Sequence, residues 1–152
     1  MTRRKQITDK LKLLLDAITI AGGYKTNFPA AKIWSPYVEN PSDGFLLVSI
    51  KDTVNNFSDQ DDATIQTLNV EVTLQCCVKD VNYTTILNMV DDVYKCIYAN
   101  KHTIQKDLNI IDINPVSDEV GLMANEREFA AAKIIFSIVH AKHYEWIYEA
   151  VS

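Results

Sequence analysis

The sequence predicts an α+β fold: a two-layer domain in which two amphipathic helices pack on one face of a mainly antiparallel β-sheet. Apolar residues recur at helical spacing in two separate stretches, and elsewhere they alternate with polar residues as in strands with one solvated face. These stretches follow in the order helix, strands, helix, strands, which suits helices gathered on one side of an antiparallel sheet. With 152 residues, 47% of them hydrophobic, the chain is expected to form a single domain, 1–152.

The first helix is expected over residues 3–21. The pair Gly22–Gly23 is expected to end it, because glycine accepts the left-handed conformation that closes a helix. Residues 24–44 hold three of the four prolines and are expected to be irregular, apart from a short strand over 31–34. The apolar stripe of the helix consists of Ile7, Leu11, Leu14, Leu15 and Ile18.

Two strands, over 45–50 and 68–77, are expected to be antiparallel neighbours. The first is continuously apolar, and the second alternates between apolar and polar residues. Between them, residues 52–64 hold four aspartates and no basic residue. Because long segments without regular structure tend to be functional or mobile, we expect an acidic loop that projects from the domain.

The second helix is expected over 81–99, followed by a polar connector over 100–107. A short strand over 108–114 should stop at Pro115, since proline donates no hydrogen bond to a sheet. A turn over 116–125 then leads into a long final strand. That strand spans 126–143, and one face of it carries Ala132, Ile134, Phe136, Ile138 and His140.

The charge is acidic and unevenly distributed. The net charge is −5 and the sequence pI is about 5.1, which argues against a general nucleic-acid coat. Residues 1–51 hold 8 Lys or Arg and 4 Asp or Glu, whereas residues 52–152 hold 7 and 16. This split is either ordinary surface scatter or the mark of a molecule with one basic and one acidic end, suited to head-to-tail contacts.

Cellular location is indicated by what the sequence lacks. No stretch approaches the ~20 apolar residues of a membrane span. The basic start is not followed by the apolar run of a signal peptide, and three cysteines are a poor disulfide framework. We therefore expect a protein made and kept in a cytosol.

A search for catalytic or metal-binding patterns finds no motif. Phosphate-cradling and nucleophile-elbow glycine patterns are absent. Asp91 and Asp92 are expected on the outer side of the second helix, pointing in different directions, which does not suit an acid/base pair. His140 and His143 should lie on opposite faces of the last strand, too far apart to share a metal ion. We expect no enzyme activity, no catalytic or metal-binding residue and no cofactor.

Candidate interface residues fall in four clusters, chosen by chemistry alone. The basic start is either a frayed helix end or faces an acidic partner. The two aromatic clusters either pack on their own domain or anchor a neighbouring subunit, because Trp and Tyr dominate interface hot spots. The clusters are the basic start (Arg3, Arg4), the Pro-rich segment (Trp34, Tyr37), the acidic loop (Asp59, Asp61, Asp62) and the C-terminal aromatics (Tyr144, Trp146, Tyr148).

Taken together, these features resemble bacteriophage tail terminator proteins, also called neck terminator or tail completion proteins. The resemblance covers nearly the whole chain and lies in the order and spacing of its elements, with no short diagnostic motif. The matching parts are the opening helix (7–21), the Pro-rich stretch (31–36), the strands at 44–50 and 68–75, the helix at 82–99, and the strand at 129–141 with its aromatic finish.

The resemblance implies a homo-oligomeric ring, usually of six copies, located in the virion tail or neck and assembled in the host cytoplasm. Such a ring caps the tail tube protein, stops tube growth and offers a docking surface to the head connector. DNA passes through its lumen without specific binding. The sequence leaves two alternatives: another phage neck or head-completion protein, or a small cytosolic enzyme or ligand-binding module with a closed apolar pocket.

Overall fold

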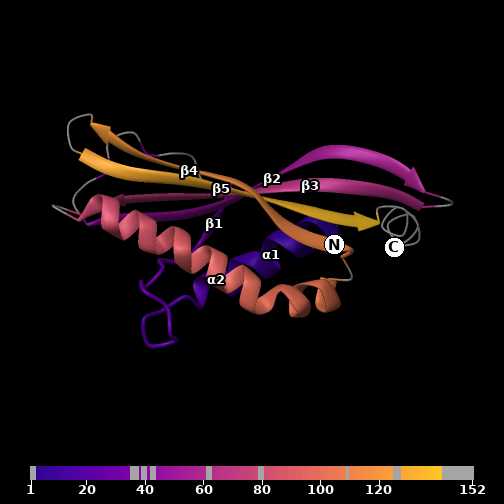
Figure 1. The fold of residues 1–152 in the computed structure, drawn as a ribbon, viewed down its shortest axis with the longest axis horizontal. Coiled ribbons are helices and arrows are strands. Elements are labelled where there is room, and N and C mark those ends of the chain that lie inside the picture. The colour runs from indigo at the N-terminus through magenta and orange to yellow at the C-terminus, as the bar shows by residue number, and fades with distance from the viewer. Residues whose placement is uncertain are drawn as a thin grey trace.

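Five strands and two helices form two layers in the computed structural model, with both helices beneath the same face of the sheet (Figure 1). The structure describes residues 3–34, 38, 41, 44–60, 63–78, 81–108, 110–124 and 128–141. The elements are α1 (Arg3–Asp16), β1 (Lys32–Ile33), β2 (Phe45–Gln60), β3 (Ala63–Cys77), α2 (Asn82–Leu108), β4 (Asp112–Ala124) and β5 (Glu128–Ala141).

The strands lie in the order β1-β2-β3-β5-β4. Every neighbouring pair is antiparallel except β1 and β2, which run parallel. The predicted α+β fold class is therefore confirmed. The crossover that places β5 between β3 and β4 leaves β1 and β4 as the two edge strands.

The core lies between the sheet and the two helices. Alternate residues of β3 and β5 point into it, as the period-2 pattern predicted, and so does the apolar stripe of α1. The large side chains that are fully buried there include Ile7, Leu11, Leu15 and Ile18, Leu68 and Leu74, Ile86 and Met89, and Phe136.

The first helix ends at Asp16, five residues before the predicted end. The backbone N–H of Ala17 and of Ile18 each bond three residues back, which tightens and closes the last turn. The carboxylate of Asp16 accepts a hydrogen bond from the N–H of Ala31 at 2.6 Å, and the carbonyl of Ile18 accepts one from Phe28 at 3.0 Å. The chain that returns after α1 therefore bonds to the Ile18 carbonyl, which a longer helix would use for its own next turn, and to the Asp16 side chain.

The second helix is longer than predicted. It continues through the expected connector at 100–107 and ends at Leu108. The reason is that the apolar stripe persists at helical spacing: Ile97, Ile104 and Leu108 are all buried. The polar residues between them occupy the solvent side of the same helix.

The predicted strand end at Pro115 and turn at 116–125 are wrong, because β4 runs through both. The register against β5 shifts between Pro115 and Ser117, so a β-bulge accommodates the proline. Since β4 is an edge strand, a proline there is tolerated. The final strand is described from Glu128 to Ala141, and the predicted positions 126, 127, 142 and 143 lie outside the described residues.

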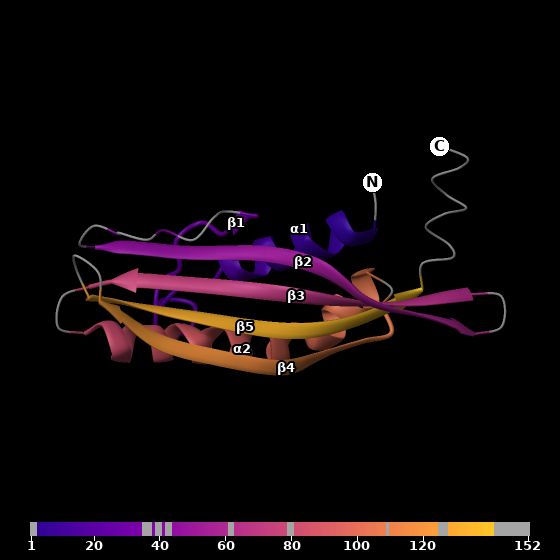
Figure 2. The same ribbon diagram turned by 90° about the horizontal axis from the view of Figure 1, so that it is seen from above.

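The expected loop at 52–64 is largely a hairpin instead. Strand pairing continues to Gln60 opposite Ala63, with one bulge after Val54. Figure 2 shows the paired ends of β2 and β3 reaching past the ends of β4 and β5. The projection is therefore the two-stranded tip of this hairpin, here called the hairpin arm (59–60 and 63–64), because the β3 residues from Ile65 onward pair with β5. Asp59 lies in this arm, while Asp61 and Asp62 lie outside the described residues.

Candidate interaction surfaces

One face of the sheet is covered by neither helix (Figure 1). Polar and small side chains of β2, β3, β5 and β4 alternate onto this open face, opposite the core residues of the same strands. The pairing register aligns Ser49, Thr73, Lys133 and Glu119 in one row across it. The sheet thus has a dry face that stabilises the domain and a largely polar face available for contact.

Part of the open face is occupied by the chain itself. The Gln75 side chain, fully buried, donates to the carbonyl of Val38 at 2.8 Å and accepts from its N–H at 3.0 Å. Leu47, which lies opposite Gln75 in the ladder, is also buried. The Pro-rich segment is therefore tied to the sheet at Val38, over β2 and β3.

An open hollow of about 350 Å³ lies at the β4 end of the same face. Its lining includes Gly121 and Ala131, two small residues that lie opposite each other in the ladder. Thr73, Lys133 and Glu119 also line it. The ligand-binding alternative called for a closed apolar pocket, whereas this hollow is open and lies in a polar sheet face.

The outer edge of β4 is exposed along most of its length. Val116, at the bulge, is 59% exposed and Leu122 is 51% exposed. Asp118 and Glu119 are exposed between them. A bulge, a proline and charged side chains are the devices that keep an edge strand from pairing indiscriminately.

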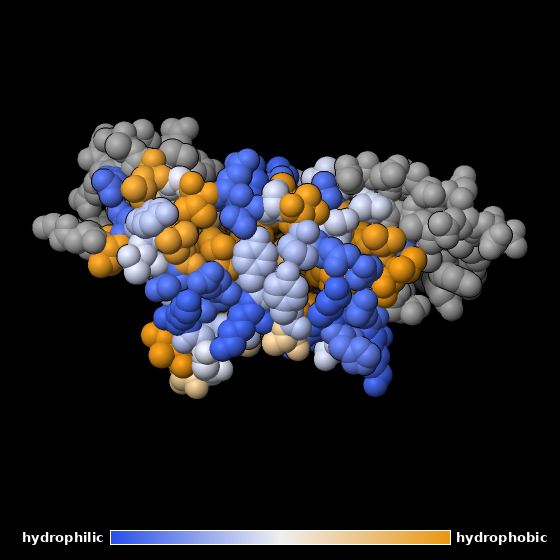
Figure 3. Space-filling model, viewed as in Figure 1, coloured by the Kyte–Doolittle hydropathy of each residue, from blue (hydrophilic) through white to orange (hydrophobic). Residues whose placement is uncertain are grey.

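A partly apolar stripe on α2 lies next to this edge. Tyr83, Leu87 and Tyr98 are exposed, and the Tyr94 hydroxyl donates to Asp118 of β4 at 2.6 Å. Figure 3 shows this side of the molecule, where hydrophobic groups stand apart from one another among hydrophilic ones. Burial, followed by the hydrogen bond to Asp118, raises the pKa of the Tyr94 phenol above its usual range.

Trp34 is the predicted interface residue that the structure presents most clearly. Its side chain is 57% exposed beside the other edge of the sheet, directly after β1. Its N–H donates to the carbonyl of Ile50 at 2.9 Å, and the Lys51 ammonium lies 5.9 Å from its ring centroid. The backbone at Trp34 has a φ of 60°, a conformation that is uncommon for a bulky residue.

Arg4 binds within its own chain. Its Nε lies 2.6 Å from Asp52 Oδ2, and the Asp52 side chain is largely buried. This ion pair joins the start of α1 to β2, so part of the predicted basic cluster has a structural role. Arg3 lies in α1. Tyr37, Tyr144, Trp146 and Tyr148 lie outside the described residues, so their interface roles stay predictions.

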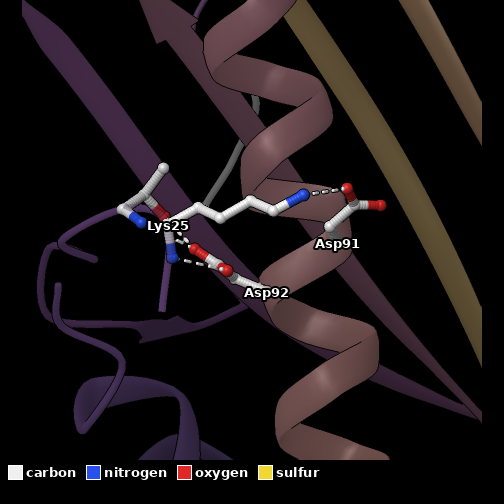
Figure 4. Close-up of polar contacts among 4 residues, drawn as sticks. Lys25, Asp91 and Asp92 are labelled. Carbon is white, nitrogen blue, oxygen red and sulfur yellow. Dashed lines mark hydrogen bonds and ion pairs between the residues drawn. The ribbon is translucent and has the colours of Figure 1, made fainter. Parts of the chain in front are cut away.

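The two adjacent aspartates of α2 have separate structural roles (Figure 4). Asp92 is buried, not outward as expected, and accepts hydrogen bonds from the N–H groups of Lys25 and Thr26 at 2.9 and 2.8 Å and from the Thr26 hydroxyl. Asp91 is exposed and pairs with the Lys25 ammonium at 2.9 Å. Both carboxylates thus bind the connection after α1.

His140 and the cysteines are buried, whereas His102 is exposed on α2. His140 is fully buried, as the strand pattern predicted, and His143 is outside the described residues. Cys76 and Cys96 are buried on the helix side, and burial raises the pKa of the Cys76 thiol to about 11. Among the described residues, no group of three or more His, Cys, Asp or Glu side chains is placed to hold a metal ion.

Comparison with known proteins adds no family assignment: no protein-family model and no curated protein matches this sequence. None of the described helices combines the length and the apolar character needed to cross a bilayer. The resemblance to tail terminators therefore depends on the order and spacing of the elements alone.

Proposed function

We propose that this chain is a structural protein of phage assembly: a tail terminator that forms a ring on the end of the tail tube and joins it to the head connector. Its work is contact and not catalysis. DNA passes through the lumen, where a net acidic chain repels phosphate.

The observation that carries this proposal is the open face of the sheet together with its two free edges. Helices cover only one face, so a small domain presents a broad polar surface and two edge strands at once. A ring subunit between a tube and a connector needs several such surfaces, because it contacts two neighbouring copies and two different partners. The hairpin arm adds a fourth feature, an extension that reaches beyond the rest of the sheet.

The proposal is tested by removing the gene from the phage that encodes it. The deletion should yield overlong tails without heads in negative-stain images, and the chain supplied in trans should restore tail length. A stop codon in an unrelated lysis gene is the matched control. Normal tails joined to heads after the deletion contradict the proposal, and so does a gene flanked by no tail or connector genes.

A further inference from the structure

One row of side chains crosses the open face from one edge of the sheet to the other. The registers pair Lys32 with Ser49, Ser49 with Thr73, Thr73 with Lys133, and Lys133 with Glu119. Lys32 therefore stands at the β1 end of the row and Glu119 at the β4 end. Both are exposed, and neither has an ion-pair partner among the described residues.

Each edge also carries an exposed apolar side chain near its end of the row. Trp34 lies two residues after Lys32 and is 57% exposed. Val116 lies three residues before Glu119, at the bulge, and is 59% exposed. Among the described residues, each edge thus offers one charge without an ion-pair partner and one exposed apolar side chain within three residues of it, and the two charges are opposite in sign.

The directions of the edge strands are compatible with continued pairing. β1 is parallel to β2, and each of the following steps across the sheet is antiparallel, so β1 and β4 run in opposite directions. A second copy placed beside β4 with the same orientation would present its β1 antiparallel to that strand. In the register that places Lys32 opposite Glu119, Trp34 lies opposite Ser117 and beside Val116.

From this match we infer that the β4 edge of one copy binds the β1 edge of the next, so that the sheet continues from subunit to subunit. The inference rests on the homo-oligomer of the proposed function and names the surfaces that form it. Two copies meeting through the same edge would bring Glu119 against Glu119, or Lys32 against Lys32, which like-charge repulsion opposes. The contact is therefore head-to-tail, the kind that closes into a ring.

The bulge, the proline and the acidic side chains of β4 favour the β1 edge of a second copy over other partners. Pro115 and the bulge limit pairing to the part of the strand beyond Val116, and Asp118 and Glu119 repel an acidic edge. Since β1 is only two residues long, the ladder between copies is short. The ion pair between Lys32 and Glu119 and the contact of Trp34 with Val116 then determine which edge binds.

Charge exchange tests the contact in the purified full chain, with the oligomeric state followed by sedimentation velocity over a concentration series. Lys32→Glu and Glu119→Lys should each weaken association at least about tenfold, because each places like charges in the interface. The double variant should recover association. A mixture of the two single variants should also assemble, because every contact in an alternating ring then joins opposite charges.

Lys106→Glu is the matched control, since Lys106 is an exposed lysine on the last turn of α2 and takes no part in the row of side chains across the open face. It should associate like the wild type. Single variants that associate like the wild type, a double variant no better than the singles, or a wild type that is monomeric at every soluble concentration would each overturn the inference. Circular dichroism of each variant verifies the fold.

The outcome is separable from that of the proposed function. If Glu119→Lys phage control tail length normally while the deletion does not, the edge contact is wrong and the terminator function stands. If the deletion leaves tails normal while charge exchange restores association, the contact stands and the terminator function is wrong.

Discussion

The two faces of the sheet differ in what holds their side chains. On the helix-covered face, apolar residues of six elements (α1, α2 and β2 to β5) pack with little exposure, and a change there is felt throughout the core. On the open face, most residues are small or polar and most are half-buried or exposed, whereas Leu47, Ser49 and Gln75 are buried. The same strands therefore carry a stabilising face and a more solvated face one residue apart, and the proposed contacts use the second of these.

The strongest test of this comparison substitutes neighbouring residues of β5. Phe136→Ala removes a fully buried ring that contacts Tyr94 and should cost about 3–5 kcal/mol of unfolding free energy. Ile135→Ala, on the open face, should cost no more than about 1 kcal/mol because that side chain is only half-buried. Urea unfolding followed by circular dichroism measures both, and equal losses would mean that the open face is covered in solution.

A second test compares the two aspartates of α2. Asp92→Ala leaves the N–H groups of Lys25 and Thr26 without their acceptor in a buried setting and should cost about 2–3 kcal/mol. Asp91→Ala removes only a solvent-exposed ion pair and should change stability by less than about 0.5 kcal/mol. The same unfolding measurement applies. A cost for Asp91→Ala as large as that for Asp92→Ala would show that the exposed pair anchors this connection.

A third test uses the loss of stability at alkaline pH, which depends on a thiol of the buried face. Burial raises the pKa of Cys76 to about 11 from an ordinary value near 9, so the folded state holds its proton more tightly than the unfolded state does. The stabilisation is complete below pH 9 and is lost as the pH rises toward 11. Unfolding titrations at pH 8 and pH 10.5 should therefore show that the wild type loses about 2 kcal/mol more than a Cys76→Ala variant does. A Cys76→Ala variant with the same pH-dependent loss would contradict this cause.

Local patterns predicted the buried face well and the extents of the elements poorly. Alternation identified the inward residues of β5, because a strand buried on one side must repeat every second residue. The continuation of α2 was missed because Ile104 is the one apolar residue in a polar stretch, although it lies one heptad after Ile97. The run of β4 through Pro115 depends on the strand being an edge, which is a property of the whole sheet.

The candidate interaction surface was the hardest part to predict. The uneven charge indicated a basic and an acidic end, but the row that joins Lys32 to Glu119 depends on four registers and on the crossover that makes β4 an edge. No local spacing contains that information. Trp34 was identified as an interface candidate by residue type alone, and the structure supplies the exposure and the neighbouring edge that residue type cannot.

The smallest expected effect concerns the hydrogen bond between Tyr94 of α2 and Asp118 of β4, here called the bridge. Tyr94→Phe removes the hydrogen bond to Asp118 but keeps the ring against Phe136, so unfolding free energy should fall by only about 0.5–1 kcal/mol. Asp118→Asn keeps an acceptor for the same hydroxyl and should cost less than that. If the β4 edge binds a neighbour, both variants should leave the charge preference at Glu119 intact, because the bridge holds β4 to α2 on the helix side of the sheet. A Tyr94→Phe variant that lost association while keeping its stability would instead place the contact on the α2 stripe.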